Sequence, residues 1–233
     1  MESEIDAYLQ KSIEFENIIV TAGEKIRSLS KNVYGDLSVV RHAYVAALHL
    51  LFEKYDEKSG DFNKERSDIL TVLCAYLQGI GITEHCISEG QYLKAAAVLK
   101  QDYEMVAKIG QIKKGIVESK RVPNAKHAPH GTQRFYGEIN GLAHPSSIGQ
   151  IQSAIVSYQT GAGYGTSFVP GFDEGTAKNF FRWHIWSLFE MSRIAFILFD
   201  EIFPGEQGFK KATLYKIMTA VEIMKKNGFM ELK

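Results

Sequence analysis

Apolar residues recur at steps of three and four along most of this chain, a spacing that places them on one face of an α-helix. The clearest stripe opens the sequence and has seven apolar members among eight: Ile5, Tyr8, Ser12, Phe15, Ile19, Ala22, Ile26 and Leu29. A second stripe runs from Leu37 to Tyr55, behind Asp36 as the expected N-cap. The pattern predicts two long helices. The first is either a dimerising helix or, as we favour, a helix laid across its own bundle.

Five further segments carry the same helical periodicity: 63–90, 91–114, 132–143, 176–203 and 208–227. Asn63 is an expected N-cap, and Gly90 and Gly228 are expected to end helices in the left-handed conformation. Gly79 and Gly81 lie within a helical segment, which favours a close helix crossing or a kink there. The segment 91–114 is expected to be the central helix.

Residues 149–175 are the least helical part of the pattern, because six glycines fall among them. The segments 154–158 and 167–169 either pair as a small hairpin or belong to a mobile loop. The whole pattern predicts a single all-α domain over residues 1–233. We expect a helical bundle of six or seven helices with this Gly-rich irregular insertion.

The composition supports a globular domain with a real core. The chain has 233 residues, of which 45% are apolar and 23% charged, and such values exclude a disordered or collagen-like chain. Its 27 basic and 27 acidic residues give a formal net charge of zero. The chain as a whole therefore has no electrostatic attraction for nucleic acid or for a membrane.

The pattern indicates neither secretion nor membrane insertion. Residues 1–6 are acidic and lack the apolar core of a signal peptide. The most apolar stretch, 180–203, contains too many charged residues for a bilayer span. Cys74 and Cys86 lie 12 positions apart in a helical pattern, too far for a disulfide. We therefore expect a cytoplasmic protein with free thiols and no membrane contact.

Glu104 is the first candidate for chemistry. It shares a helical stripe with small apolar residues, so its carboxylate is expected to be half buried and to need a partner. Lys100 one turn away, or His144 or Arg134 from the next helix, can supply that partner. The functional interpretation is an acid/base pair in a pocket. We favour the structural interpretation, a polar clamp between two helices.

Tyr136 and His144 join Glu104 as the candidate catalytic residues. With Asn140 they form one polar stripe on the short helix 132–143, at steps of four. Such a stripe lines a site or is simply a solvated face, and the second is somewhat more common.

Basic residues cluster between positions 108 and 134. Seven bases less one acid, Glu118, leave a local charge of +6. The candidate anion-binding residues are Lys113, Lys114, Lys120, Arg121, Lys126 and Arg134. This cluster is either a solvated loop, the commoner case, or a site that binds RNA, DNA or a phosphorylated ligand. We expect at most weak, salt-sensitive nucleic-acid or phosphate binding through it.

Motifs for metals and nucleotides are incomplete. His127-x-x-His130 has a spacing found in metal sites, but Pro129 lies between and no Cys or carboxylate is nearby in sequence. The run Gly161-Ala-Gly-Tyr-Gly165 has the composition of a phosphate cradle without the Lys of a P-loop. We expect no metal and no cofactor.

Two segments carry a family resemblance: Glu89-Gly-Gln-Tyr-Leu-Lys-Ala-Ala-Ala-Val-Leu-Lys-Gln-Asp-Tyr-Glu104 and Phe135-Tyr-Gly-Glu-Ile-Asn-Gly-Leu-Ala-His-Pro-Ser146. Over residues 66–146 the chain resembles a loose group of bacterial all-helical proteins of unknown function. Their pattern is a helix with Gly, small residues, a base and a Glu, followed by a Tyr-x-x-Leu-Ser-x-x-His-Pro-Ser-like segment.

The chain departs from that pattern at two places. Lys100 stands where the group often has Arg, and Ile139-Asn140 replaces its Leu-Ser. The resemblance implies an α-helical bundle of bacterial origin, with Glu104 and His144 as paired polar positions. It implies no established activity.

A second comparison is with the helical ribonucleases of toxin and defence systems, which use an Arg and a His four to six residues apart on a helix. Arg121 and His127 have five residues between them, although Pro123 interrupts a helix there. We expect a non-catalytic or ligand-sensing helical domain, a component of a bacterial regulatory or defence locus. The alternative is a metal-independent ribonuclease that uses this Arg/His pair.

Assembly follows from the apolar surfaces. Aromatic residues of the segment 180–203 point in every direction around a helix. Either the protein's own chain wraps this helix on all sides, or one face meets another subunit. Together with the stripe from Ile5 to Leu29, this favours a two-fold homodimer over a monomer.

Overall fold

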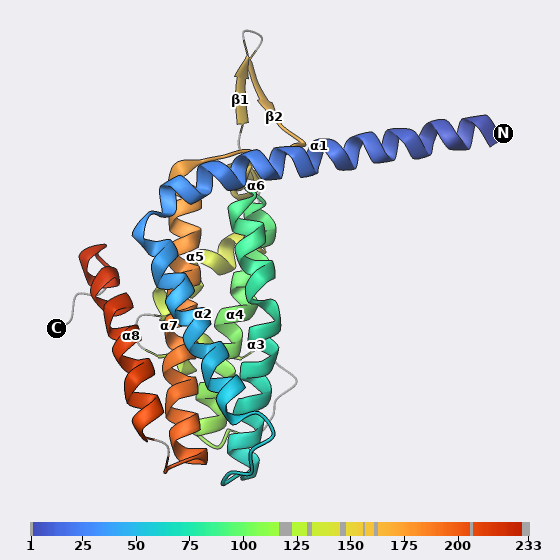
Figure 1. The fold of residues 1–233 in the computed structure, drawn as a ribbon. Helices are drawn as coiled ribbons and strands as arrows, with labels where there is room; N and C mark the ends of the chain where they lie inside the picture. Colours follow the sequence, from blue (N-terminus) through green and yellow to red (C-terminus); the bar gives the residue numbers. More distant parts are fainter. Residues whose placement is uncertain are drawn as a thin grey trace.

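The chain folds into a bundle of long α-helices, drawn as a ribbon in Figure 1. The structure is a computed structural model that describes residues 2–116, 123–129, 132–144, 148–155, 157–160, 163–205 and 207–229, a few of them by backbone alone. The helices are α1 (Glu2–Tyr34), α2 (Asp36–Tyr55), α3 (Lys64–Ser88), α4 (Tyr92–Lys113), α5 (Thr132–Ala143), α6 (Ile148–Ala154), α7 (Glu174–Ile202) and α8 (Gln207–Lys226). A short 3-10 helix, η1 (Ala125–His127), and an antiparallel hairpin of β1 (Ser157–Thr160) and β2 (Gly163–Thr166) complete the described elements.

Helix ends follow the chemistry that the sequence predicts, with one exception. The side chain of Asn63 accepts a hydrogen bond from the Arg66 amide at 2.8 Å and caps α3. Gly90 has a φ of +73° and separates α3 from α4, a conformation that favours glycine. The prediction that Asp36 caps α2 is wrong, because Gly35 holds that position and Asp36 is the first helical residue.

Helix α7 forms the axis of the bundle, so the expectation that the segment 91–114 is the central helix is wrong. The buried residues of α7 face every direction around the helix, from Ala177 to Ile202, because α2, α3 and α4 pack against it from different sides (Figure 1). The ring of Phe181 stacks on Tyr34 with 3.7 Å between centroids. Of the two possibilities for this aromatic helix, the structure shows the first: its own chain covers it almost completely.

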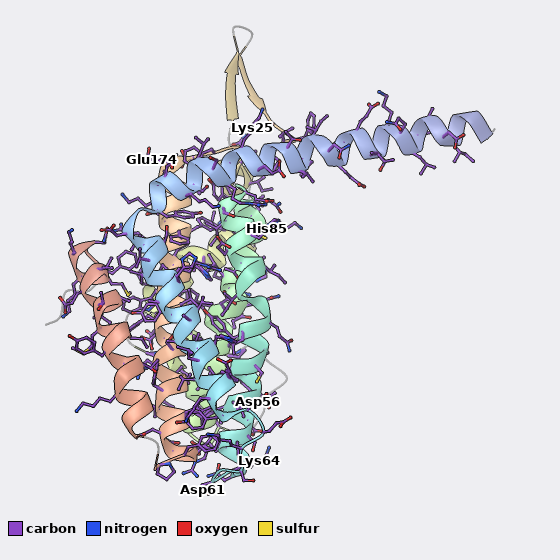
Figure 2. The ribbon with its side chains drawn as sticks, in the orientation of Figure 1. Lys25, Asp56, Asp61, Lys64, His85 and Glu174 are labelled. Carbon is purple, nitrogen blue, oxygen red and sulfur yellow. The ribbon has the colours of Figure 1, made fainter. Side chains whose placement is uncertain are left out.

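Helix α1 crosses one end of the bundle, and its N-terminal half projects beyond it (Figure 1). Ile26 is only 5% exposed, whereas Ile5 is 58% and Tyr8 79% exposed. Every residue from 5 to 18 is exposed, and we call this segment the arm. Most side chains of the arm stand clear of the bundle in Figure 2, and Phe15 near its inner end stacks on the exposed ring of Phe168. The stripe of the first helix is thus half packed on its own bundle and half uncovered.

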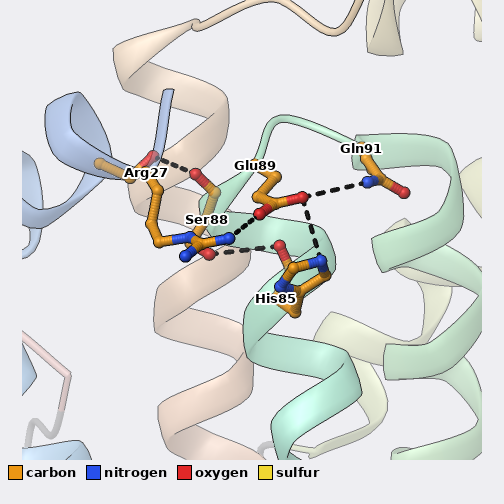
Figure 3. A network of polar contacts seen from close by, with 6 residues as sticks. Arg27, His85, Ser88, Glu89 and Gln91 are labelled. Carbon is orange, nitrogen blue, oxygen red and sulfur yellow. Dashed lines mark hydrogen bonds and ion pairs between the residues drawn. The ribbon is translucent and has the colours of Figure 1, made fainter. Parts of the chain in front are cut away.

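A polar network fixes the other half of α1 to the bundle (Figure 3). Glu89, whose side chain is 9% exposed, accepts hydrogen bonds from Arg27 of α1 and from Gln91. His85 Nε2 lies 3.0 Å from the same carboxylate. A Cβ on Gly23 would lie 2.9 Å from Glu89 Cδ. This close approach explains a glycine that helix propensity disfavours in the middle of α1.

The all-α fold is confirmed, but the expected number of helices is too low. The described residues contain eight α-helices instead of six or seven, because α6 lies within the Gly-rich segment. The hairpin is present with other strands than expected: Ser157 pairs with Thr166 and Thr160 with Gly163. Its strands therefore begin after residue 156 and end before residue 167.

The expectation that Gly79 and Gly81 allow a close helix crossing is wrong. A Cβ at either position would meet no atom within 4 Å, so neither glycine allows a close helix crossing. The helix α3 continues past both of them from Lys64 to Ser88.

One helix of the described residues, α3, has the length and mean hydropathy of a membrane span. It packs against α4 and α7 within the bundle, and core helices commonly have such composition. Length and composition alone therefore do not make α3 a membrane helix.

Candidate functional site

Four polar side chains form a continuous chain between α4 and α5. The phenol of Tyr136 donates a hydrogen bond to Glu104 Oε1 at 3.1 Å. Lys100 Nζ lies 2.9 Å from the same oxygen and 2.7 Å from His144 Nε2. The structure thus brings together all three candidate catalytic residues, Glu104, His144 and Tyr136, and links them through Lys100.

The expected burial of Glu104 is confirmed, since its side chain is 17% exposed. Burial and the hydrogen bond to Glu104 raise the pKa of Tyr136 to about 12, so the phenol stays protonated and keeps donating. An ammonium group has no lone pair, so Lys100 donates to His144, whose Nε2 is the acceptor. The carboxylate is held from both sides, which is the geometry of a polar clamp between two helices.

A cavity of about 370 Å³ opens at the C-terminal end of α4. We call it the basic cavity. It lies between α4, the segment 123–129, the first turn of α5, and α7. Its lining consists of apolar residues and a set of cationic or polar ones: Lys113, Lys114, Lys126, His127, Gln133 and Arg193. No carboxylate belongs to the part of this lining that the structure describes.

Local geometry brings the segment 123–129 against α4. Asn124 accepts a hydrogen bond from the Lys126 amide at 3.0 Å and starts the 3-10 helix η1. The backbone carbonyl of His127 then lies directly over Gly110, where a Cβ would overlap it. Ala128 follows and is buried at 8% exposure. Gly110 is therefore the residue that lets this segment close the basic cavity.

The electrostatics of the basic cavity favour an anion. Lys113, Lys114 and Lys126 pair with no carboxylate in the part of the chain that the structure describes. Desolvation, together with the charges of Lys114 and Lys126, lowers the pKa of His127, so its imidazole is neutral at pH 7. The first turn of α5, which includes Gln133, adds the positive end of a helix dipole.

The charge of Arg193 is partly neutralised by Glu190, which lies three residues earlier on α7. Arg193 Nε and Nη2 donate to Glu190 Oε2 at 3.1 and 2.9 Å. The Glu190 side chain is 5% exposed, and burial raises its pKa although Arg193 acts in the opposite direction. Three unpaired lysines thus dominate the charge of the basic cavity.

The structure gathers only part of the predicted anion-binding set. Lys113, Lys114 and Lys126 line one cavity as the sequence suggested. Lys120 and Arg121 lie outside the described residues, and Arg134 is described by its backbone alone. Sequence reasoning missed Arg193, because it is far along the chain on α7 and no local pattern points to it.

Two buried ionisable groups also escaped the sequence analysis. Asp102 accepts a hydrogen bond from Thr83 Oγ1 at 3.0 Å, and burial raises its pKa to about 7. His184 is 0% exposed, and neither ring nitrogen has a partner among the described residues. Burial, helped by the charge of Arg41, lowers the pKa of His184 to about 3. Neither group was predicted to be special, because each lies within an ordinary helical stripe.

Among the described residues no group of His, Cys, Asp and Glu is arranged to hold a metal ion. In the motif His127-x-x-His130, His130 lies outside the described residues. Both cysteines are free, and burial raises the pKa of Cys86, which keeps this thiol protonated.

The fold and the site define an all-α helical bundle with a basic cavity at the end of one core helix. No family model matches the chain, and neither a curated protein nor a solved structure with significant similarity to it was found.

Proposed function

We propose that this protein is a non-catalytic, ligand-sensing helical domain that binds a small phosphate-bearing ligand in the basic cavity. The observation that carries the proposal is the lining: Lys113, Lys114, Lys126 and Arg193 converge on one cavity that has no described carboxylate. Ammonium and guanidinium groups are the side chains that bind phosphate oxygens by charge-assisted hydrogen bonds.

The size of the cavity and the charge of the chain support a small ligand. About 370 Å³ accommodates a few phosphate groups or a mononucleotide-sized molecule. A net charge of zero gives no extended field to hold a nucleic-acid duplex. We further propose that this sensor belongs to a bacterial regulatory or defence system. Free Cys74 and Cys86 support a reducing cytoplasm as its compartment.

The direct test is calorimetric titration with pyrophosphate. Changing both Lys113 and Lys126 to Gln should weaken binding by about tenfold or more, because two charge-assisted contacts disappear. The matched control changes the exposed Lys25 and Lys178 to Gln, which removes the same charge elsewhere. Equal loss in both pairs would show a nonspecific charge effect and contradict the proposal. So would pyrophosphate binding that is undiminished at several hundred millimolar salt.

A second candidate is metal-independent RNA cleavage, and one observation favours it. His127 and Arg193 line the same cavity, the kind of His/Arg pairing that such chemistry uses to move a proton and to stabilise a phosphorane. A neutral His127 is available as the base. Cleavage of a single-stranded RNA in the presence of a chelator, lost in His127→Ala, would establish this function. Binding without cleavage would leave the sensor as the better description.

We also propose that two copies pair through the arm. Its apolar residues follow a heptad-like 3,4 spacing and project from the bundle, with Ile5, Tyr8 and Phe15 exposed by 58, 79 and 49%. An isolated helical arm of this length is marginal in water, so a covering partner stabilises it. Asp6, Glu14 and Glu16 outnumber Lys11 along the arm, which disfavours an anionic membrane as that partner. Two-fold pairing of identical stripes covers the exposed apolar side chains of both copies at once.

A further inference from the structure

A second cavity lies between α7 and α8, with Tyr44 of α2 among its lining residues. We call it the α7–α8 cavity. It measures about 340 Å³, within the range of small-molecule sites. It exists because α8 packs mainly against α2 and only slightly against α7. Its walls are predominantly apolar: Tyr44, Phe189, Phe196, Ile197, Leu214 and Ile217.

A buried hydroxyl group belongs to this lining. Ser192 is 1% exposed, and its Oγ has no hydrogen-bond partner among the described residues. Buried polar groups are almost always hydrogen-bonded, and a helical serine usually bonds the preceding turn or a neighbour. An unpartnered hydroxyl beside an apolar cavity is a group that a ligand with a polar end can satisfy.

The lining also contains one basic and one acidic side chain. Arg193 and Asp200 both line the cavity, and seven residues of α7 separate them by about 10 Å. Arg193 uses Nε and Nη2 for Glu190, which leaves Nη1 without a partner among the described residues.

We propose that the α7–α8 cavity binds a small amphipathic carboxylate. The apolar chain of the ligand lies along Phe196 and Ile217, and its carboxylate accepts hydrogen bonds from Arg193 Nη1 and Ser192 Oγ. The proposal stands on the apolar lining and on Ser192. Arg193 also lines the basic cavity, so the two proposed sites share this one residue.

The probes are octanoate, its neutral analogue octanamide, and octylamine, each titrated calorimetrically into the full chain. Octanoate should bind about tenfold more tightly than octanamide, because only the carboxylate forms an ion pair with Arg193. Arg193→Gln should reduce octanoate affinity to that of octanamide. The matched control is Lys178→Gln, which removes a positive charge from an exposed position of the same helix and should change neither affinity.

A second pair of variants tests the apolar wall. Ile217→Trp should fill the cavity and abolish binding of both octanoate and octanamide. Leu214→Gln alters a side chain that is 44% exposed, so the fold tolerates it, and it should weaken both probes alike. Lys113→Gln with Lys126→Gln should leave octanoate binding unchanged, which separates this site from the basic cavity.

Three outcomes would overturn the proposal. Equal affinities for octanoate and octanamide would remove Arg193 as the recognition group. Tighter binding of octylamine than of octanoate would show that the cavity does not recognise a carboxylate. Unchanged octanoate binding in both Leu214→Gln and a folded Ile217→Trp variant would place the ligand elsewhere on the chain.

Discussion

The backbone carbonyl of His127 lies directly over Gly110 of α4, at the place that a Cβ would occupy. This contact joins a segment of irregular backbone to a core helix and closes the basic cavity. A residue with any side chain at position 110 has to push the 123–129 segment away. The relationship therefore connects one glycine to the shape of the candidate site.

Gly110→Ala is expected to destabilise the protein by about 1–3 kcal/mol, as overpacking does, and to weaken pyrophosphate binding. Urea denaturation and calorimetry measure the two effects. Gly79→Ala is the matched control, because a Cβ there meets nothing within 4 Å. It should stabilise α3 by roughly 0.5–1 kcal/mol through helix propensity. If Gly110→Ala behaves like its control, the contact with His127 does not constrain the segment.

The hydrogen bond between Tyr136 and Glu104 should contribute measurably to stability. Glu104→Ala leaves the partly buried Tyr136 phenol without its acceptor. It also removes the carboxylate from Lys100, which keeps only His144 as a partner. We expect a loss of about 1–3 kcal/mol in the free energy of unfolding. Tyr136→Phe should cost about 0.5–1.5 kcal/mol, and the double variant less than the sum of the two. If the stability losses of the two single variants add up to that of the double variant, Tyr136 and Glu104 do not interact directly.

Asp102 and His184 should affect stability in opposite directions as the pH changes. Burial raises the pKa of Asp102 from 3.8 to about 7, so the native state binds the extra proton in this range. The contribution of Asp102 to the free energy of unfolding is full below pH 3.8 and is lost as the pH rises towards 7. Burial lowers the pKa of His184 from 6.5 to about 3. The contribution of His184 to the free energy of unfolding is full above pH 6.5 and is lost as the pH falls towards 3.

Between pH 4 and 6.5 these two contributions offset each other in the native chain. Asp102→Asn removes one of them, so the variant should gain stability relative to the parent as the pH rises through this range. The slope of that difference is at most about 1.4 kcal/mol per pH unit. Urea denaturation at a series of pH values measures it, with the exposed Asp56→Asn as control. Parallel pH profiles for parent and Asp102→Asn would show that Asp102 titrates normally.

The helices and the polar clamp were predictable because the signals are local. A stripe at 3,4 spacing reports a helix directly, and Lys100 and Glu104 are one turn apart on such a stripe. Their partners Tyr136 and His144 lie on the next helix along the chain, which commonly packs against its predecessor. Such short-range logic explains why this part of the candidate site was anticipated.

Other features depend on contacts between distant parts of the chain. Arg193 reaches the basic cavity from α7, and nothing near residue 193 in the sequence indicates this. Gly110 looks like any helical glycine until the carbonyl of His127 is placed above it. Helix α6 was missed because it spans only seven residues, too few for a periodic pattern to stand out. Tertiary packing, and not local propensity, determines these features.

The exposed arm of α1 should hold two copies of the chain together. If two copies pair through it, light scattering at micromolar concentration should give about twice the 26.2 kDa of one chain. Changing Ile5 and Tyr8 together to Lys puts charges on the stripe and should return the mass to that of one chain, since apolar burial is what holds the pair together.

Val39 and Ile82 provide the control for this change, because they are exposed by 57 and 58% on other helices. Lysine at both positions adds the same charge without touching the arm, and the mass should stay doubled. A native chain that scatters as a single 26.2 kDa particle would end the dimer proposal. A doubled mass that survives lysine at Ile5 and Tyr8 would move the interface away from the arm. The exposed heptad stripe would then need another partner, because eight large apolar side chains of α1 remain exposed in one copy: Ile5, Tyr8, Leu9, Ile13, Phe15, Ile18, Val20 and Leu29.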